Sequence, residues 1–416
     1  MFFLYQIILT LIIFFSPLII IYRIFKNKED KQRFKEKFSL PSIKKKEGKL
    51  IWFHGASVGE IQSIIPLIKH YEKNKSIKEI LVTSSTLSSS RIIKKFKFKK
   101  TIHQFYPIDH SYFTNKFLNY WKPSIAIFIE SEIWPGMFNS IDQRKIPLIL
   151  LNARLTKKTF KRWMKIKIFS KNIFNKITIA YPQNLETKSY LNKLNVSKIL
   201  EVGNIKFSET NEKFQDNINN RLNLEFKKKK VWVASSTHKP EEIFCALSHQ
   251  KLKKNIRNLL TIIIPRHVHR SKTILSDLKK LKLNVVYHSS KIQNLKNIDI
   301  YLVDTFGETK IFHKMSSSVF LGGSIIKRGG QNPLEAARYG SKIFHGPHTG
   351  NFKDVYKLLK SLKVSKTVRT PNQLASSIVF KKNKFTGFKI KKIGEKILKK
   401  TIKELDFLIK NEFKKT

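Results

Sequence analysis

Short apolar runs alternate with helical stretches along most of this chain, and this alternation limits the possible folds. The first series of predicted strands comprises residues 50–55, 79–83, 124–130, 146–152 and 176–181. The second series comprises residues 231–235, 260–265, 283–288, 299–304 and 319–321. Such alternation is typical of parallel sheets whose two faces are both covered by helices. We therefore predict an α/β fold with two sheets.

A polar segment, residues 209–230, lies between the two series and is predicted to connect two domains, residues 49–208 and 231–387. From residue 388 to residue 416, apolar residues recur at helical spacing, which predicts a long final helix with one apolar face. Ligands of parallel α/β domains bind at the carboxyl ends of the strands. A cleft between the two domains is therefore the expected site.

The N-terminal 22 residues carry no charged side chain. A helix of that length spans about 33 Å, which is enough to cross the hydrocarbon core of a bilayer. The basic start and small-residue cleavage site of a signal peptide are missing. Residues 23–48 are strongly basic, so the positive-inside rule places the remaining chain in the cytoplasm. We expect a single-pass membrane anchor at 1–22. A hairpin or an interfacial helix is the alternative.

The charge of the chain is strongly positive, with 82 Lys+Arg against 29 Asp+Glu and a net charge of +53. Lysine is spread along the whole sequence, which counts against a nucleic-acid-binding patch. Basic residues near an anionic leaflet gain about 1 kcal/mol each, so anionic membrane lipids are the expected partner. Cys245 is the only cysteine, which excludes a disulfide within the chain and fits a reducing compartment.

The stretch from Ser317 to Phe352 predicts a strand, a glycine loop, a helix that ends at Gly340, and a second strand that begins with residues 342–344. The first strand ends at Gly322-Gly323, and the helix begins with residues 332–335. Asn332 suits the N-cap, Pro333 suits the first helical position, and Glu335 suits a capping box. Glycine amides and a helix N-terminus favour an anion, so a bound phosphate is expected. An ordinary strand-helix crossover with a good cap is the alternative.

Carboxylates follow two predicted strands of the first domain. Glu60 closes the loop HGASVGE (residues 54–60), where it could act as a general base. Ser57 and Glu60 also have the spacing of a capping box, which is the structural alternative. Glu130 and Glu132 follow another strand and could be functional, or could be ordinary salt-bridge or helix-dipole residues.

Polar loops follow the strands of the second domain as well. Residues 235–238 (SSTH) could form a ligand loop or an N-cap, and Arg266 is well placed to bind a phosphate. The backbone of residues 304–308 could hold a base or a ribose. His267 and His269 would not share a helix face, and no HExxH motif occurs, so no metal site is predicted.

Nine motifs occur in order along nearly the whole chain. They are HGASVGE, ESEIWP, LNARLT, GNIKF, SSTH, PRHVHR, DTFGE, GGQNPLEAA and GPHTGNF. Together they closely resemble the family of Kdo transferases, which add 3-deoxy-D-manno-octulosonic acid (Kdo) to lipid A precursors. The resemblance implies a GT-B type fold, with two Rossmann-like domains and an interdomain cleft. It also implies CMP-Kdo as the donor and no requirement for a metal or other cofactor.

The resemblance also assigns roles to residues of this chain. Glu60 matches the general base, and Glu130 and Lys206 match positions that stabilise the transition state. The positions that match contacts to CMP are Pro265, Arg266, Phe306, Gly307, Glu308, Asn332, Pro333, Leu334 and Glu335. The chain departs from the family pattern at Gly136, where asparagine is usual, and at Gln331, where histidine often occurs.

These observations predict an inverting glycosyltransferase of the inner membrane that transfers Kdo from CMP-Kdo to the lipid A precursor lipid IVA. A GT-B enzyme that uses another nucleotide-sugar is the first rival. The second rival is a membrane-tethered basic protein that binds nucleic acid, which would need clustered basic and aromatic residues on one surface.

Overall fold

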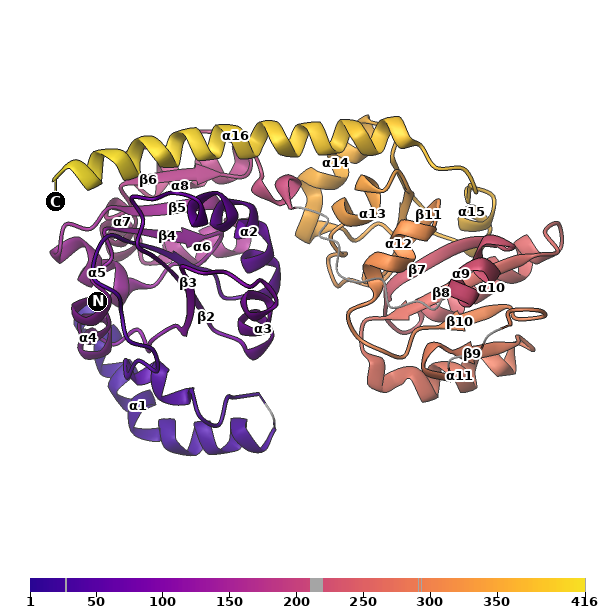
Figure 1. The fold of residues 1–416 in the computed structure, drawn as a ribbon, viewed down its shortest axis with the longest axis horizontal. Helices are drawn as coiled ribbons and strands as arrows, with labels where there is room; N and C mark the ends of the chain where they lie inside the picture. Colours follow the sequence, from indigo (N-terminus) through magenta and orange to yellow (C-terminus); the bar gives the residue numbers. More distant parts are fainter. Residues whose placement is uncertain (27, 210–219, 291, 293, 416) are drawn as a thin grey trace. The chain divides into compact units, whose positions relative to one another are not determined.

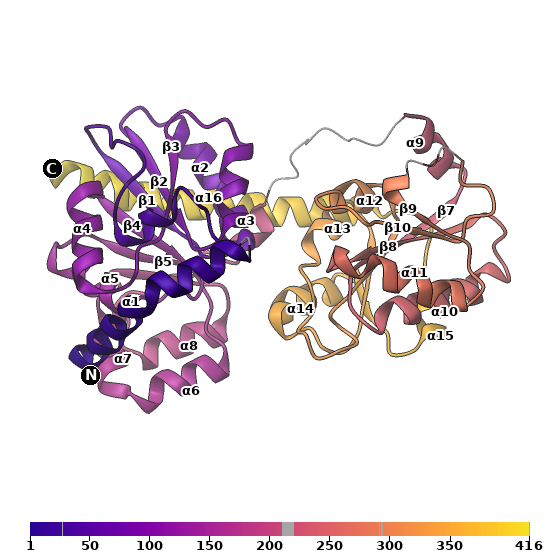
Figure 2. The same cartoon turned by 90° about the horizontal axis from the view of Figure 1, so that it is seen from below.

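The structure is a computed structural model that describes residues 1–26, 28–209, 220–290, 292 and 294–415. The chain divides into two compact units. The first unit comprises Met1–Thr210 and Gly394–Thr416, and the second comprises Asn211–Ile393. Figure 1 follows the chain from its indigo N-terminus to its yellow C-terminus, and Figure 2 shows it from below. Each unit contains one parallel sheet, as predicted.

The first unit is built on six strands in the order β3-β2-β1-β4-β5-β6, and all neighbouring pairs are parallel. The strands are β1 (Leu50–His54), β2 (Glu79–Ser84), β3 (Thr101–Phe105), β4 (Ile125–Ile129), β5 (Leu148–Ala153) and β6 (Ile179–Pro182). The helices are α1 (Phe2–Phe25), α2 (Val58–Glu72), α3 (Leu87–Lys95), α4 (Ser111–Trp121), α5 (Pro135–Gln143), α6 (Lys157–Lys165), α7 (Lys167–Asn175) and α8 (Leu185–Lys193). Two short 3₁₀ helices are η1 (Phe34–Phe38) and η2 (Ile205–Ser208).

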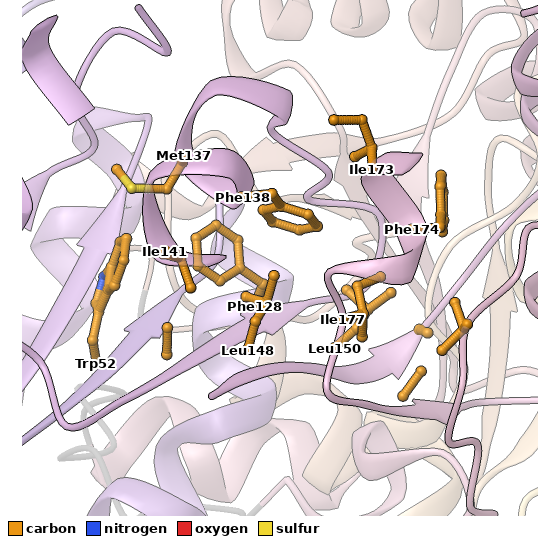
Figure 3. Packing of buried hydrophobic residues seen from close by; sticks show 14 of the residues in the cluster. Trp52, Phe128, Met137, Phe138, Ile141, Leu148, Leu150, Ile173, Phe174 and Ile177 are labelled. Carbon is orange, nitrogen blue, oxygen red and sulfur yellow. The ribbon is translucent and has the colours of Figure 1, made fainter. Parts of the chain in front are cut away.

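Alternate residues of β1 enter two separate cores on the two faces of this sheet. Trp52 packs with Phe128 of β4 and Phe138 of α5, and Figure 3 shows this core. Phe53 belongs to the other core, which includes Ile64 of α2. Because both faces are buried, the strands have continuous apolar sequences rather than alternating ones.

The second unit has seven parallel strands in the order β13-β12-β11-β7-β8-β10-β9. They are β7 (Lys230–Thr237), β8 (Leu259–Pro265), β9 (Val285–Tyr287), β10 (Ile300–Leu302), β11 (Ser318–Leu321), β12 (Lys342–His345) and β13 (Ser365–Thr367). The helices are α9 (Asn220–Lys227), α10 (Glu241–Lys253), α11 (Ser271–Lys280), α12 (Thr309–Met315), α13 (Leu334–Arg338), α14 (Lys353–Ser361) and α15 (Pro371–Ala375). Of the predicted connection 209–230, residues 210–219 lie outside the described residues, and α9 occupies part of the remainder.

The final helix, α16 (Lys384–Lys415), begins at Lys384 rather than at residue 388. Its Leu405 and Ile409 join the second core of the first unit. A Cβ atom on Gly394 would lie 2.0 Å from the carbonyl oxygen of Phe207, so only glycine allows α16 to pass this close to η2. The helix therefore packs directly against the segment that carries Lys206.

Candidate active site

The first candidate site lies at the carboxyl edge of the first sheet, where β1 and β4 are neighbours. The strand order changes direction at this point. β1 pairs on one side with β2, which leads to β3, and on the other side with β4, which leads to β5 and β6. Such switch points are the usual ligand sites of parallel α/β sheets. The loops after β1 and β4 carry Glu60, Glu130 and Glu132.

Glu60 lies in the first turn of α2 and closes a capping box with Ser57. Its Oε2 accepts the N–H of Ala56 (2.6 Å) and of Ser57 (3.3 Å), and its Oε1 accepts the Ser57 hydroxyl (2.9 Å). Burial raises the pKa of Glu60 to about 7; the charges of Glu132 and Glu130 add to this effect, and the hydrogen bonds from Ser57 oppose it. The capping box predicted as the structural alternative is therefore present. It holds a carboxyl group that titrates near neutral pH, which a general base requires.

Glu132 is held in a chain of polar contacts that begins inside the sheet. Its Oε2 lies 3.1 Å from Nε2 of the buried His54 and accepts the indole N–H of Trp134 at 2.9 Å. His54 Nδ1 lies 2.9 Å from the Thr83 hydroxyl. Burial opposes ionisation of Glu132, but the contacts with His54 and Trp134 outweigh it and hold its pKa below the ordinary value. Glu132 is therefore an anion near Glu60 at neutral pH.

Glu130 forms a buried ion pair with Lys206, which η2 brings to the same edge of the sheet. The backbone of Glu130 has a φ of +58°, a left-handed conformation that non-glycine residues adopt rarely and at a cost. The Asn204 side chain accepts the Lys206 N–H (3.0 Å) and so fixes the start of η2. The structure thus brings together Glu130 and Lys206, which are far apart in sequence, and places charge from Glu130 near Glu60.

Gly136, one of the two departures from the family pattern, has a structural reason in this chain. The carboxylate of Asp109 accepts the N–H groups of Gly136 and Met137, both at 2.7 Å, and so caps α5. A Cβ atom on Gly136 would lie 1.9 Å from the Asp109 carbonyl oxygen. Asparagine could not fit here without a backbone shift. Asp109 gave no sequence signal, because it follows a strand that the sequence did not predict.

The second candidate site lies at the carboxyl edge of the second sheet, and part of the glycine loop there binds a side chain of the protein. The buried carboxylate of Glu241 already accepts the N–H groups of Gly323 (2.7 Å), Ser324 (2.9 Å) and Ile325 (2.9 Å). It also accepts the N–H of His238 at 3.0 Å. Glu241 thus occupies the first amides of the glycine loop and helps to hold the loop in shape.

The helix that follows this loop also differs from its prediction. α13 spans only five residues, and its N-cap is Pro333 rather than Asn332. The Asn332 side chain accepts the N–H of Leu334 (3.0 Å). Glu335 forms no capping box; its carboxylate lies 2.9 Å from His313 Nδ1. Burial opposes ionisation, but the His313 contact outweighs it and lowers the pKa of Glu335.

Positive and aromatic side chains surround the ends of β7 and β8. Arg266 is exposed after the buried Pro265, and its N–H donates to the Thr237 carbonyl. The rings of His238 and His267 lie 5.5 Å apart. Burial lowers the pKa of His238, and the positive charges of His267, Arg328 and Arg266 add to this. An anionic ligand would be attracted to this edge.

The loop after β10 carries the remaining predicted contacts. Phe306 is 81% exposed, and Gly307 has a φ of +98°. The Glu308 carboxylate lies 3.0 Å from His288 Nε2 and accepts the Thr305 hydroxyl. Within the described residues, no group of three or more His, Cys, Asp or Glu side chains could hold a metal ion.

The fold defines the class of the protein. Two parallel-sheet α/β units form a GT-B type fold with Rossmann-like domains. UDP-GlcNAc 2-epimerase from Neisseria meningitidis has a similar fold, with a TM-score of 0.57 at 12% identity, over 86% of this chain and 100% of that structure. The glycotransferase of kitacinnamycin has a TM-score of 0.52 at 8% identity, over 88% of this chain and 100% of that structure.

The sequence comparisons define the family. The family model for 3-Deoxy-D-manno-octulosonic-acid transferase (kdotransferase) matches residues 32–209. The 3-deoxy-D-manno-octulosonic acid transferase of Rickettsia bellii is 34% identical over 92% of this chain and 91% of the relative. That of Haemophilus influenzae is 31% identical over 74% of this chain and 73% of the relative. The chain therefore belongs to the family of Kdo transferases and is a glycosyltransferase.

Proposed function

We propose that this protein transfers Kdo from CMP-Kdo to lipid IVA with inversion, and that Glu60 is the general base. The observation that carries the proposal is the raised pKa of Glu60, about 7, at the switch point of the first sheet. A base with a pKa near the pH of the cell is deprotonated often enough to act and basic enough to accept a hydroxyl proton. In this role Glu60 would remove the proton from the acceptor hydroxyl that attacks Kdo.

The ion pair of Glu130 and Lys206 supports a second role at the same edge. Departure of CMP leaves positive charge on the sugar, and carboxylates held in place stabilise such charge. A buried carboxylate keeps its charge only if a partner compensates for desolvation. Lys206 provides that partner for the buried Glu130.

The second unit would hold the donor. We propose that the residues in contact with CMP are Pro265, Arg266, Phe306, Gly307, Glu308, Asn332, Pro333, Leu334 and Glu335. The basic edge around Arg266 and Arg328 suits the phosphate of CMP and the carboxylate of Kdo. The exposed ring of Phe306 suits contact with a nucleoside. Because arginine can neutralise phosphate directly, transfer without a metal ion is part of the proposal.

The apolar helix α1 fits a membrane anchor. We propose that it holds the enzyme at the cytoplasmic face of the inner membrane, where the lipid acceptor resides. The basic residues that follow α1 would attract both anionic lipids and the phosphates of the acceptor. We propose no nucleic acid partner, because the lysines are spread along the whole chain.

The test is transfer by the purified full-length chain with lipid IVA as acceptor and either CMP-Kdo or UDP-sugars as donors. We expect product from CMP-Kdo alone, and kcat/KM at low acceptor should rise about tenfold per pH unit until pH reaches about 7. Transfer only from a UDP-sugar would refute the donor. A flat profile between pH 5 and 8 would refute Glu60 as the base.

A further inference from the structure

Polar side chains in the N-terminal part of helix α1 form hydrogen bonds with the rest of the first unit. The Tyr5 hydroxyl donates to Asp109 Oδ2 at 2.6 Å. Gln6 Oε1 accepts both the N–H and the hydroxyl of Ser111 at 2.8 Å. The polar residues of the N-terminal half of α1 therefore bind the loop that opens α4.

The burial pattern distinguishes two faces of the helix. Partly or fully buried residues recur every third or fourth position, at Phe2, Tyr5, Leu9, Ile13, Ser16, Ile20 and Arg23. That spacing marks one face of a helix. Ser16, in the middle of this face, is 7% exposed. One face of α1 is thus the more buried one, and the helix is held to the unit near both ends, through Tyr5 and Gln6 at one end and at the other through Arg23, which pairs with the buried Glu29.

The opposite face of α1 is a long apolar surface. Its most exposed side chains are Phe3 (77%), Phe14 (78%) and Phe25 (81%). Soluble proteins rarely expose a continuous apolar strip of this size unless it meets a membrane or a partner. Lys26, Lys28, Lys31 and Lys35 are exposed just beyond the helix. Positive charge beside an apolar strip fits an anionic lipid surface, whereas a second copy of the chain would bring these lysines close together.

Docking of this kind is incompatible with a helix that crosses the bilayer. Tyr5 and Arg23 are separated by about 27 Å of helix, nearly the thickness of the hydrocarbon core. If Arg23 stayed at the cytoplasmic boundary, a crossing helix would carry Tyr5 to the far side. Asp109, the hydrogen-bond partner of Tyr5, belongs to the unit that contains the first sheet and would stay on the cytoplasmic side. A helix that crosses the bilayer therefore cannot keep the hydrogen bond between Tyr5 and Asp109.

We propose that α1 lies in the plane of the membrane, with the face of Phe3, Phe14 and Phe25 in the lipid and the face of Tyr5 and Ser16 on the protein. This differs from the single-pass anchor expected from the sequence. Asp109, which binds Tyr5, also caps α5 directly after the loop that carries Glu130. The helix that enters the lipid is therefore hydrogen-bonded to the protein next to the loop that carries Glu130.

The test measures the depth of single labelled positions in vesicles of phosphatidylglycerol and phosphatidylethanolamine. In the full chain with Cys245→Ala, the variants Phe3→Cys, Phe14→Cys and Phe25→Cys carry a fluorescent thiol label. Nitroxide lipids with shallow or deep spin labels then quench it. In-plane binding predicts equal depth at all three positions. A crossing helix predicts that position 14 lies about 16 Å deeper than position 3, a result that would overturn the proposal.

Ser16→Cys is the matched control, because it lies at the middle of the helix on the opposite face. We expect its label to be shielded from both quenchers, whereas a crossing helix would place it deep in the lipid. Absence of quenching at positions 3, 14 and 25 in a self-associated chain would also overturn the proposal, in favour of a second copy. Vesicles of phosphatidylcholine alone should bind the chain at least about tenfold more weakly. The readout needs no turnover, so it is independent of the proposed reaction.

Discussion

The substitution Glu60→Gln should strongly reduce transfer and stabilise the fold above neutral pH. The pKa of Glu60 rises from 4.5 to about 7 in the folded protein. The folded state therefore binds the proton of the Glu60 carboxyl group more tightly than the unfolded chain does. The stability that this bound proton contributes to the fold is lost as pH rises through about 7. Glutamine carries no charge, and it can complete the capping box with Ser57 just as glutamate does.

The size of the effect follows from the same pKa. A difference of about 2.5 pH units corresponds to about 3.4 kcal/mol once both states are ionised. Glu60 is partly exposed, so solvent screening reduces this to roughly 1–2 kcal/mol. The variant should therefore be more stable than the native chain by that amount near pH 8.5, and equally stable near pH 4. Transfer should fall by about 10²–10⁴.

Urea unfolding followed by tryptophan fluorescence at the two pH values measures the free-energy difference. Thr156→Ala is the control, because it removes the N-cap of another helix of the same unit, α6, and leaves the Glu60 carboxyl group and its donors in place. It should cost about 1 kcal/mol at both pH values. An equal loss of stability at both pH values in Glu60→Gln would refute the reasoning. That result would mean that Glu60 acts mainly as a cap.

Three further predictions concern the groups that hold the two sites. Lys206→Met leaves the buried Glu130 without its partner, so it should cost about 3–5 kcal/mol in urea unfolding and abolish transfer. Gly136→Ala forces a Cβ atom onto the Asp109 carbonyl and should cost about 1–3 kcal/mol in thermal unfolding. The substitution Glu241→Gln replaces one carboxylate oxygen by an amide group, so the side chain can no longer accept all the backbone N–H groups that hold the glycine loop. Calorimetry should therefore show at least tenfold weaker binding of CMP.

Each of these variants has a matched control. Lys206→Arg keeps the positive charge and should recover most of the stability lost in Lys206→Met. Gly350→Ala adds a Cβ atom where no other atom lies within 4 Å, so it should leave thermal unfolding unchanged. Normal CMP binding by Glu241→Gln, or unchanged stability of Lys206→Met and Gly136→Ala, would contradict the corresponding prediction.

The central strands could be predicted from the sequence because burial on both faces gives continuous apolar runs, as in β4 and β5. The edge strands β3 and β13 were missed, because sequences such as Thr-Ile-His-Gln-Phe and Ser-Lys-Thr give no such signal. The capping box of Glu60 was predicted because its spacing is local. The pair of Glu130 and Lys206 could not be found by spacing, since the two residues meet only through the tertiary fold.

The partners of the carboxylates explain why the pKa of Glu60 is raised whereas those of Glu132 and Glu335 are lowered. Glu132 contacts His54, and Glu335 contacts His313. Such partners favour or compensate the negative charge. Within the part of the chain that the structure describes, the groups that donate to Glu60 are two backbone amides and the Ser57 hydroxyl, all neutral. These donors fix the position of the carboxyl group but do not offset the rise in its pKa caused by burial and by the nearby charges. Glu60 therefore keeps its proton up to about pH 7 and can exchange it near that pH.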